Sequence, residues 1–138
     1  MIKTITTSVL LAAFSLTAFA QEDVTARHIK NPDFEVNYLT YWKNSGMQMQ
    51  NNASFKKNGG VYAEKWVGKG SKVGNGSMTQ EILRLPQGKY TLKAKAQNIQ
   101  QDSPDKAQTG AEIFAGDAAT TVTTQGDYEL EFTHLHGD

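Results

Sequence analysis

Three residues in one short segment have the types and spacing to bind a sugar. Tyr62, Glu64 and Trp66 alternate along the chain, so in an extended strand their side chains would share one face. A flat aromatic ring can stack on the apolar face of a sugar, and a neighbouring carboxylate can bind its hydroxyl groups. Tyr41, which precedes Trp42, is a further aromatic candidate. The sequence therefore predicts a ligand-binding set of Tyr62, Glu64, Trp66 and Tyr41.

The same aromatic side chains are also candidates for the hydrophobic core. The chain is poor in aliphatic residues, and each tryptophan buries a large area, so we expect Trp42 and Trp66 to be needed inside. If Glu64 lies on a buried face, its carboxylate must be paired with a hydrogen-bonding group. Exposure of Tyr62 and Trp66 on one surface would favour sugar binding, whereas burial of both would favour a structural role.

A second group of residues has the oxygen atoms that calcium prefers. Asn31, Asp33 and Glu35 fall close together at a predicted transition from strand to turn, and carboxylate and carbonyl oxygens suit this ion. The sequence predicts a structural calcium site with Asn31 and Glu35 as ligands. The alternative is that Asn31-Pro32 only forms a turn and that the Glu35 side chain is solvated.

Short runs of alternating apolar and polar residues, separated by glycine, proline, asparagine and aspartate, predict strands throughout the chain. Gly88–Ile99 is the clearest strand, Ser77–Leu83 is its expected hairpin partner, and Tyr128–Phe132 is a second strand with one buried face. The expected fold is all-β: an antiparallel, jelly-roll-like β-sandwich of about seven or eight strands, because the connections are too short for helical crossovers. Weaker strands are expected at Met49–Phe55, Val61–Val67, Ala111–Ala115 and Thr120–Thr124.

Residues 1–20 have the pattern of a secretory signal peptide. Lys3 provides a basic start, Val9–Ala20 is an apolar run, and Ala18-Phe19-Ala20 is a small-x-small cleavage signal. The apolar run is too short to span a bilayer as a helix. The chain contains no cysteine, so a lipid-anchored lipoprotein is not expected. We predict removal of residues 1–20, which leaves residues 21–138 as a single β-sandwich domain.

Composition and motifs argue against two broad classes of function. The chain has 14 basic and 14 acidic residues, so it lacks the positive charge of a typical nucleic-acid-binding protein. It has no cysteine nucleophile, no G-x-S-x-G or H-E-x-x-H motif, and no glycine-rich phosphate loop followed by a helix. We therefore expect a protein that is not an enzyme and does not bind nucleic acid.

An ordered set of motifs resembles a known class of binding module. The motifs are Asn31-Pro32-Asp33-Phe34-Glu35, Trp42, Tyr62–Trp66, Met78–Ile82 and Leu85–Leu92. In this order they resemble the galactose-binding-like β-sandwich modules of secreted Bacteroidetes glycan-processing proteins, which are relatives of carbohydrate-binding modules. The resemblance implies a non-catalytic glycan-binding or accessory module in the periplasm or at the cell surface of a Gram-negative bacterium. It also implies that Glu35, which follows the family's phenylalanine, is a calcium ligand.

One departure from the family pattern affects both the metal and the edges of the sheets. Such modules close with a further strand that carries an aromatic residue and an acidic calcium ligand, whereas this sequence ends in His134–Asp138. We therefore expect an uncovered strand edge and marginal stability as a monomer, with stabilisation either by self-association through that edge or by added downstream sequence. The alternative function is a structural or protein-interaction module with no sugar ligand.

Overall fold

The computed structural model describes residues 7–18, 22–36, 39–52, 60–66, 75–100, 103–107, 111–123 and 125–135. These residues form eleven strands and one short helix, α1 (Thr25–His28). The strands are β1 (Thr7–Ala18), β2 (Glu22–Asp23), β3 (Lys43–Ser45), β4 (Gln48–Gln50), β5 (Tyr62–Trp66), β6 (Ser77–Thr79), β7 (Gly88–Gln100), β8 (Ser103–Ala107), β9 (Glu112–Ala115), β10 (Ala118–Thr121) and β11 (Gln125–His134). Within the described residues, no helix is long and apolar enough to cross a membrane.

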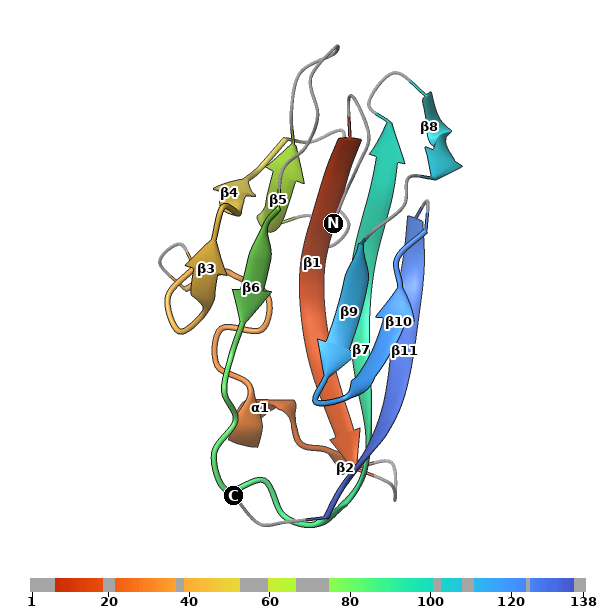
Figure 1. Ribbon diagram of the computed structural model, residues 1–138. Helices are drawn as coiled ribbons and strands as arrows, with labels where there is room; N and C mark the ends of the chain where they lie inside the picture. Colours follow the sequence, from red (N-terminus) through yellow and green to blue (C-terminus); the bar gives the residue numbers. More distant parts are fainter. Residues whose placement is uncertain are drawn as a thin grey trace.

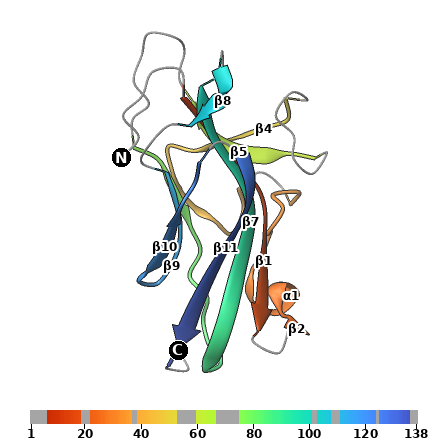
Figure 2. The ribbon, with the colours of Figure 1, turned by 90° about the vertical axis from the view of Figure 1, so that its right-hand side faces the viewer.

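One large sheet and two small sheets make up the fold (Figure 1). The large sheet has the strand order β11-β7-β1-β5-β4, with β2 added to β1 and β8 added to β7. The small sheets are the pairs β9–β10 and β3–β6, and every pairing is antiparallel. Figure 2 shows β9 and β10 in a layer in front of one face of the large sheet. The prediction of an all-β, antiparallel protein is confirmed.

The hydrophobic core lies between these layers. Leu16, Leu92 and Leu130 of the large sheet pack with Ile113 and Val122 of the β9–β10 side in one buried cluster. The alternation of β7 and β11 explains this, because every second residue of a strand points to the same face. On the opposite face of the same two strands, lysine and acidic residues pair across the sheet, at 3.6 Å for Lys93–Glu129 and 3.0 Å for Lys95–Asp127.

A second buried cluster contains Phe34, Leu39, Met47 and Ala63. Trp42 packs against both clusters, with its ring centroid 5.3 Å from that of Phe14 and 5.7 Å from that of Phe34. Trp42 was expected in the core; its side chain packs against both clusters but is only partly buried. Aromatic side chains supply much of the buried area here, as the low aliphatic content requires.

The hairpin predicted between Ser77–Leu83 and Gly88–Ile99 is wrong. The observed strand β6 ends at Thr79 and pairs with β3. Both edges of β7 are instead taken by β1 and β11. The connection before β7 is irregular, since Arg84 has a φ of +59° and the segment includes Pro86. Of the predicted strand Met49–Phe55, residues 53–55 lie outside the described part of the chain.

The predicted signal sequence contains a strand at the centre of the large sheet. Strand β1 pairs with β7 from Thr7↔Gln100 to Ala18↔Tyr90, and with β5 from Ser8↔Trp66 to Leu11↔Ala63. An apolar run of this length suits a central strand as well as a signal peptide, because both are uncharged and apolar. The cleavage of residues 1–20 stays a prediction, and the structure shows the chain with β1 in place.

Candidate functional site

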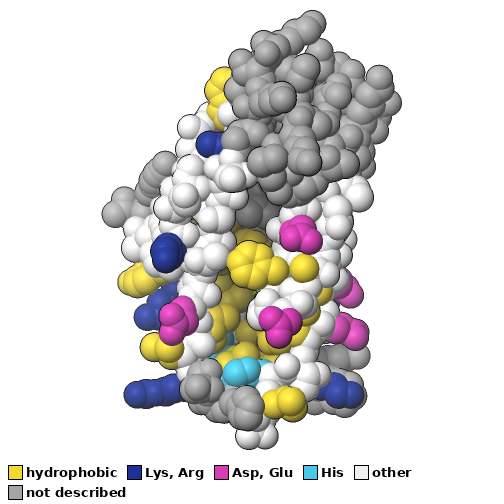
Figure 3. Space-filling model, in the orientation of Figure 1, with side chains coloured by type: hydrophobic (Ala, Val, Ile, Leu, Met, Phe, Trp, Pro, Cys, Tyr) yellow, Lys and Arg dark blue, Asp and Glu magenta, His cyan; other side chains and the backbone are white. Residues whose placement is uncertain are grey.

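An apolar groove opens between the two small sheets. It has a volume of about 780 Å³, which lies in the range of about 300–1,000 Å³ usual for ligand sites. Phe14, Leu16 and Leu92 of the large sheet line its floor, and residues of β6 and β9 line its two sides. Figure 3 shows the hollow from the front, with hydrophobic side chains inside it and acidic side chains around it.

The sides of the groove are strand edges. Within the described residues, β6 pairs only with β3, and β9 pairs only with β10. Figure 1 shows that the other edges of β6 and β9 face each other, and residues of both strands line the groove. An edge that pairs with no strand presents backbone N–H and C=O groups that another strand can bind. The groove therefore combines an apolar floor with hydrogen-bonding edges.

The rim of the groove is apolar and acidic. Phe114 and Leu135 line it and are 52% and 66% exposed. Glu112 and Asp117 also line it and are exposed, whereas no described lysine or arginine does. Exposed large apolar side chains beside an open groove are typical of an interaction site, and the local charge favours a ligand with cationic groups.

The structure places the three alternating candidates on one face of β5, as predicted. Ala63 belongs to the second buried cluster, so Tyr62, Glu64 and Trp66 lie on the side of β5 that faces away from that cluster. Tyr62 and Glu64 are nonetheless buried, with 0% and 5% exposure, whereas Trp66 is 46% exposed. The expectation that Trp66 lies in the core is therefore wrong. The three do not form an open row, and Trp66 alone is presented to solvent.

Glu64 lies in a row of residues across the sheet that is polar except at its β1 position, and we call it the polar row. It is in register with Gln48 of β4 on one side and Leu10 of β1 on the other, and Leu10 is in register with Gln97 of β7. The Gln48 Nε2 donates a hydrogen bond of 3.0 Å to Glu64 Oε2. Burial raises the pKa of Glu64, while the side chains of Gln48 and then Gln50 oppose the rise. Burial also raises the pKa of Tyr62, with a further contribution from the charge of Glu64.

Sequence reasoning missed Gln48 and Gln97 as neighbours of Glu64. Gln97 is only 2% exposed, although it lies on the lysine-bearing face of the alternation in β7. No spacing within the sequence indicates that these glutamines share a row with Glu64, because the row depends on the register of four strands. The residue pattern of each single strand therefore does not predict which residues share a row with Glu64.

Tyr41 lies in a different part of the fold. It precedes β3, is 58% exposed, and has a φ of +75°, which is unusual for a bulky residue. The Lys30 Nζ lies 5.2 Å from the centroid of its ring, a cation–π distance. The Gln80 side chain joins the two residues, donating to the carbonyl oxygens of Lys30 at 2.8 Å and Tyr41 at 3.3 Å. The structure therefore holds Tyr41 on the surface, separate from the face of β5.

The predicted metal ligand Asn31 is buried and organises a loop. Its Nδ2 donates to the carbonyl oxygens of Val36 and Thr40, both at 3.0 Å, and its Oδ1 accepts a 2.9 Å bond from the Val36 N–H. Its own carbonyl oxygen accepts a 2.9 Å bond from the indole N–H of Trp42. The side-chain oxygen that a calcium ion would need therefore already binds a backbone N–H group.

The second predicted ligand, Glu35, lies against the start of the β5 segment. Its Oε1 accepts a 3.4 Å bond from the Val61 N–H. A Cβ atom at position 60 would lie 2.0 Å from this oxygen, so the contact requires Gly60. Within the described residues, no group of three or more histidine, aspartate or glutamate side chains is placed to hold a metal ion. Asn31 and Glu35 instead connect the N-terminal loop to its neighbours.

Comparisons with known proteins add no family to this description. No protein-family model, curated protein or solved structure matches the chain. The comparisons therefore show neither a family nor a function. A function has to be argued from the groove, the face of β5 and the strand edges.

Proposed function

We propose that this protein is a non-catalytic binding module that takes an extended segment of another protein into the groove between β6 and β9. The observation that carries this proposal is the pairing of an apolar floor with two strand edges that face each other. A strand added at such edges gains main-chain hydrogen bonds, and its side chains gain specificity from the pockets beneath. Small apolar ligands would use the floor but would leave both edges without partners.

The groove defines the sequence that it would accept. A bound strand would point every second side chain toward the floor formed by Phe14, Leu16 and Leu92. Those alternate positions should therefore be apolar, and the positions between them should be polar because they face solvent. Glu112 and Asp117 at the rim favour lysine or arginine at the ends of the segment.

Fluorescence polarisation with the full chain tests this assignment. The probe is a labelled peptide with a core of roughly six alternating valine and threonine residues and lysine at both ends. Phe114→Ala and Leu135→Ala should each weaken binding by about tenfold, equivalent to about 1.4 kcal/mol. Leu83→Ala is the matched control, because Leu83 is 68% exposed but does not line the groove.

Three results would count against the proposal. One is a lack of peptide binding, and another is equal weakening by Leu83→Ala and Leu135→Ala. The third is a concentration-dependent dimer in ultracentrifugation that Leu135→Ala dissociates, which would make a second copy of this chain the occupant. That last result would instead support the predicted self-association through a strand edge.

A second candidate function is glycan binding at the face of β5, and the polar row favours it. Trp66 is exposed on the same face as Tyr62 and Glu64, and Gln48 and Gln97 share the row of Glu64. The exposed Trp66 indole offers stacking to a sugar and the exposed Gln48 amide offers hydrogen bonds, whereas Glu64 and Gln97 are buried. On this proposal the layers form a jelly-roll β-sandwich of the galactose-binding-like type, secreted to the periplasm or cell surface.

Affinity electrophoresis against host and plant polysaccharides tests the glycan proposal. Retardation that Trp66→Ala abolishes and that Tyr41→Ala leaves intact would support binding at β5. Because Trp66 is half exposed, its replacement should leave the circular dichroism spectrum unchanged. A panel in which no polysaccharide retards the protein would remove this candidate.

A further inference from the structure

The position of β1 is a slot lined by hydrogen-bonding groups on both sides. On one side, β7 pairs with β1 along the whole strand. On the other side, β5 pairs with the first part of β1, and the chain from Val24 to Pro32 contacts the second part. The Val24 N–H donates to the Leu16 carbonyl oxygen at 2.8 Å, and the Phe14 N–H donates to the Pro32 carbonyl oxygen at 2.9 Å.

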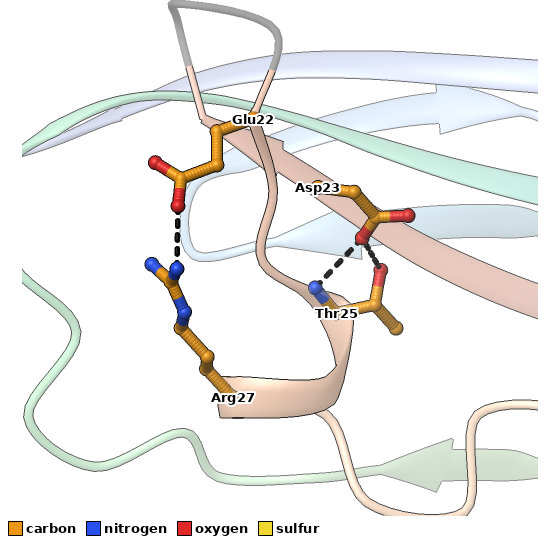
Figure 4. Close-up of polar contacts among 4 residues, drawn as sticks. All are labelled: Glu22, Asp23, Thr25 and Arg27. Carbon is orange, nitrogen blue, oxygen red and sulfur yellow. Dashed lines mark hydrogen bonds and ion pairs between the residues drawn. The ribbon is translucent and has the colours of Figure 1, made fainter.

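A turn immediately after the predicted cleavage point completes this slot (Figure 4). The Leu16 N–H donates a 2.7 Å hydrogen bond to Thr25 Oγ1. Asp23 fixes Thr25 by accepting bonds from its backbone N–H at 2.9 Å and from its hydroxyl at 2.6 Å. Arg27 and Glu22 form a surface ion pair across the same turn. Glu22, Asp23, Thr25 and Arg27 all belong to the chain that remains after cleavage at Ala20, whereas Leu16 belongs to the part removed.

Removal of residues 1–20 would therefore leave a vacancy in the centre of the large sheet. The carbonyl oxygen of Pro32, the N–H of Val24 and the β1-facing edge of β7 would all lose their partners. A buried polar group without a partner destabilises the fold, so each of these groups favours binding of a replacement strand. The core would also lose Phe14 and Leu16, of which Leu16 is 1% exposed.

We propose that processing after Ala20 turns the position of β1 into an acceptor site for an extended strand of another polypeptide. The present occupant shows what such a strand must contain. Phe14, Leu16 and Ala18 pack on the main core cluster, so the incoming strand needs apolar residues at these three alternate positions. It must run antiparallel to both β5 and β7, as β1 does.

The register adds a requirement that β1 itself does not meet. Position 10 lies between Glu64 and Gln97, which are 5% and 2% exposed. Leucine offers no hydrogen-bonding group at this position, whereas the buried Glu64 carboxylate beside it is hydrogen-bonded by Gln48 from the β4 side. Residues directly opposite in antiparallel strands interact with each other. A glutamine or lysine at this position would therefore suit the slot better than Leu10.

Strand exchange in the full chain tests the inference. A protease site introduced after Ala20 allows the folded full-length protein to be nicked. The probes are labelled synthetic peptides of residues 7–18 with terminal lysines added for solubility, in native form and with Leu10→Gln or Leu16→Asp. Native mass spectrometry and fluorescence polarisation then measure replacement of the nicked fragment.

We expect the native peptide to enter the nicked protein. The Leu10→Gln peptide should bind roughly tenfold more tightly, and the Leu16→Asp peptide at least about tenfold more weakly. Absence of uptake, or equal binding of the native and Leu16→Asp peptides, would overturn the acceptor site. Equal binding of the native and Leu10→Gln peptides would overturn the stated requirement at position 10.

The exported protein provides an independent check. Intact-mass measurement should show an N-terminus at Gln21, as the cleavage signal predicts. A mature protein that retains residues 7–18 would keep its own strand in the slot, which would overturn a role for the slot in binding other chains. Because Phe14 and Leu16 line the groove, the groove of the processed protein is complete only when a strand occupies the slot. The groove assay uses the full chain with β1 in place, and Leu135→Ala should not affect peptide exchange, so failure of the groove proposal and failure of this inference are distinguishable.

Discussion

Replacement of Leu16 by alanine tests directly whether β1 is part of the core. The Leu16 side chain is 1% exposed and belongs to the main buried cluster. The mutation removes three carbon atoms, which at about 0.8 kcal/mol per buried methylene gives about 2.4 kcal/mol. A rigid cavity would raise the cost toward about 5 kcal/mol. Because Leu16 also borders the open groove, solvent can fill part of the space, and we expect about 2–3.5 kcal/mol.

The measurement is urea unfolding of the full-length chain. Cell-free synthesis without membranes keeps residues 1–20 attached. Circular dichroism reports the sheet, and fluorescence of Trp42 reports the core, because its ring packs against Phe14. Leu135→Ala is the control, since Leu135 is 66% exposed, and it should change the free energy of unfolding by at most about 0.5 kcal/mol. An equally small effect of Leu16→Ala would refute the placement of β1 in the core.

Three further mutations test the polar interactions. Burial raises the pKa of Glu64 above 4.5. The stability that protonated Glu64 contributes is therefore full below pH 4.5 and is lost as the pH rises through the pKa of the folded state. Glu64→Gln should remove this pH-dependent loss, as measured by urea unfolding at pH 4 and at pH 8. Hydrogen bonds from Thr25 lower the pKa of Asp23, so Thr25→Val should raise that pKa in a carboxyl NMR titration. Asn31→Ala leaves buried backbone groups without partners, which costs about 1–3 kcal/mol for each group, and it places alanine at a φ of +52°. Asn31→Asp keeps the acceptor oxygen, so it should lower the free energy of unfolding in urea by less than Asn31→Ala does.

Local sequence patterns were enough to predict the secondary structure of the clearest segments. The alternation in Gly88–Ile99 and Tyr128–Phe132 predicted strands with one buried face; the first segment is β7 without its last residue, and the second lies in the middle of β11. The same period placed Tyr62, Glu64 and Trp66 on one face of β5. Such predictions succeed because the direction of a side chain in an extended strand follows from local backbone geometry, whatever the strand packs against.

The partners of each strand face and each strand edge could be seen only in the folded chain. Tyr62 and Glu64 are buried, although their alternation in the sequence did not show whether the face that they share is buried or exposed to solvent. The amide of Asn31 is used by its own loop, a role that its short motif did not distinguish from metal binding. The groove, the polar row and the position of Thr7–Ala18 all depend on pairing between strands far apart in the chain. Register and burial are long-range properties, so no local pattern could specify them.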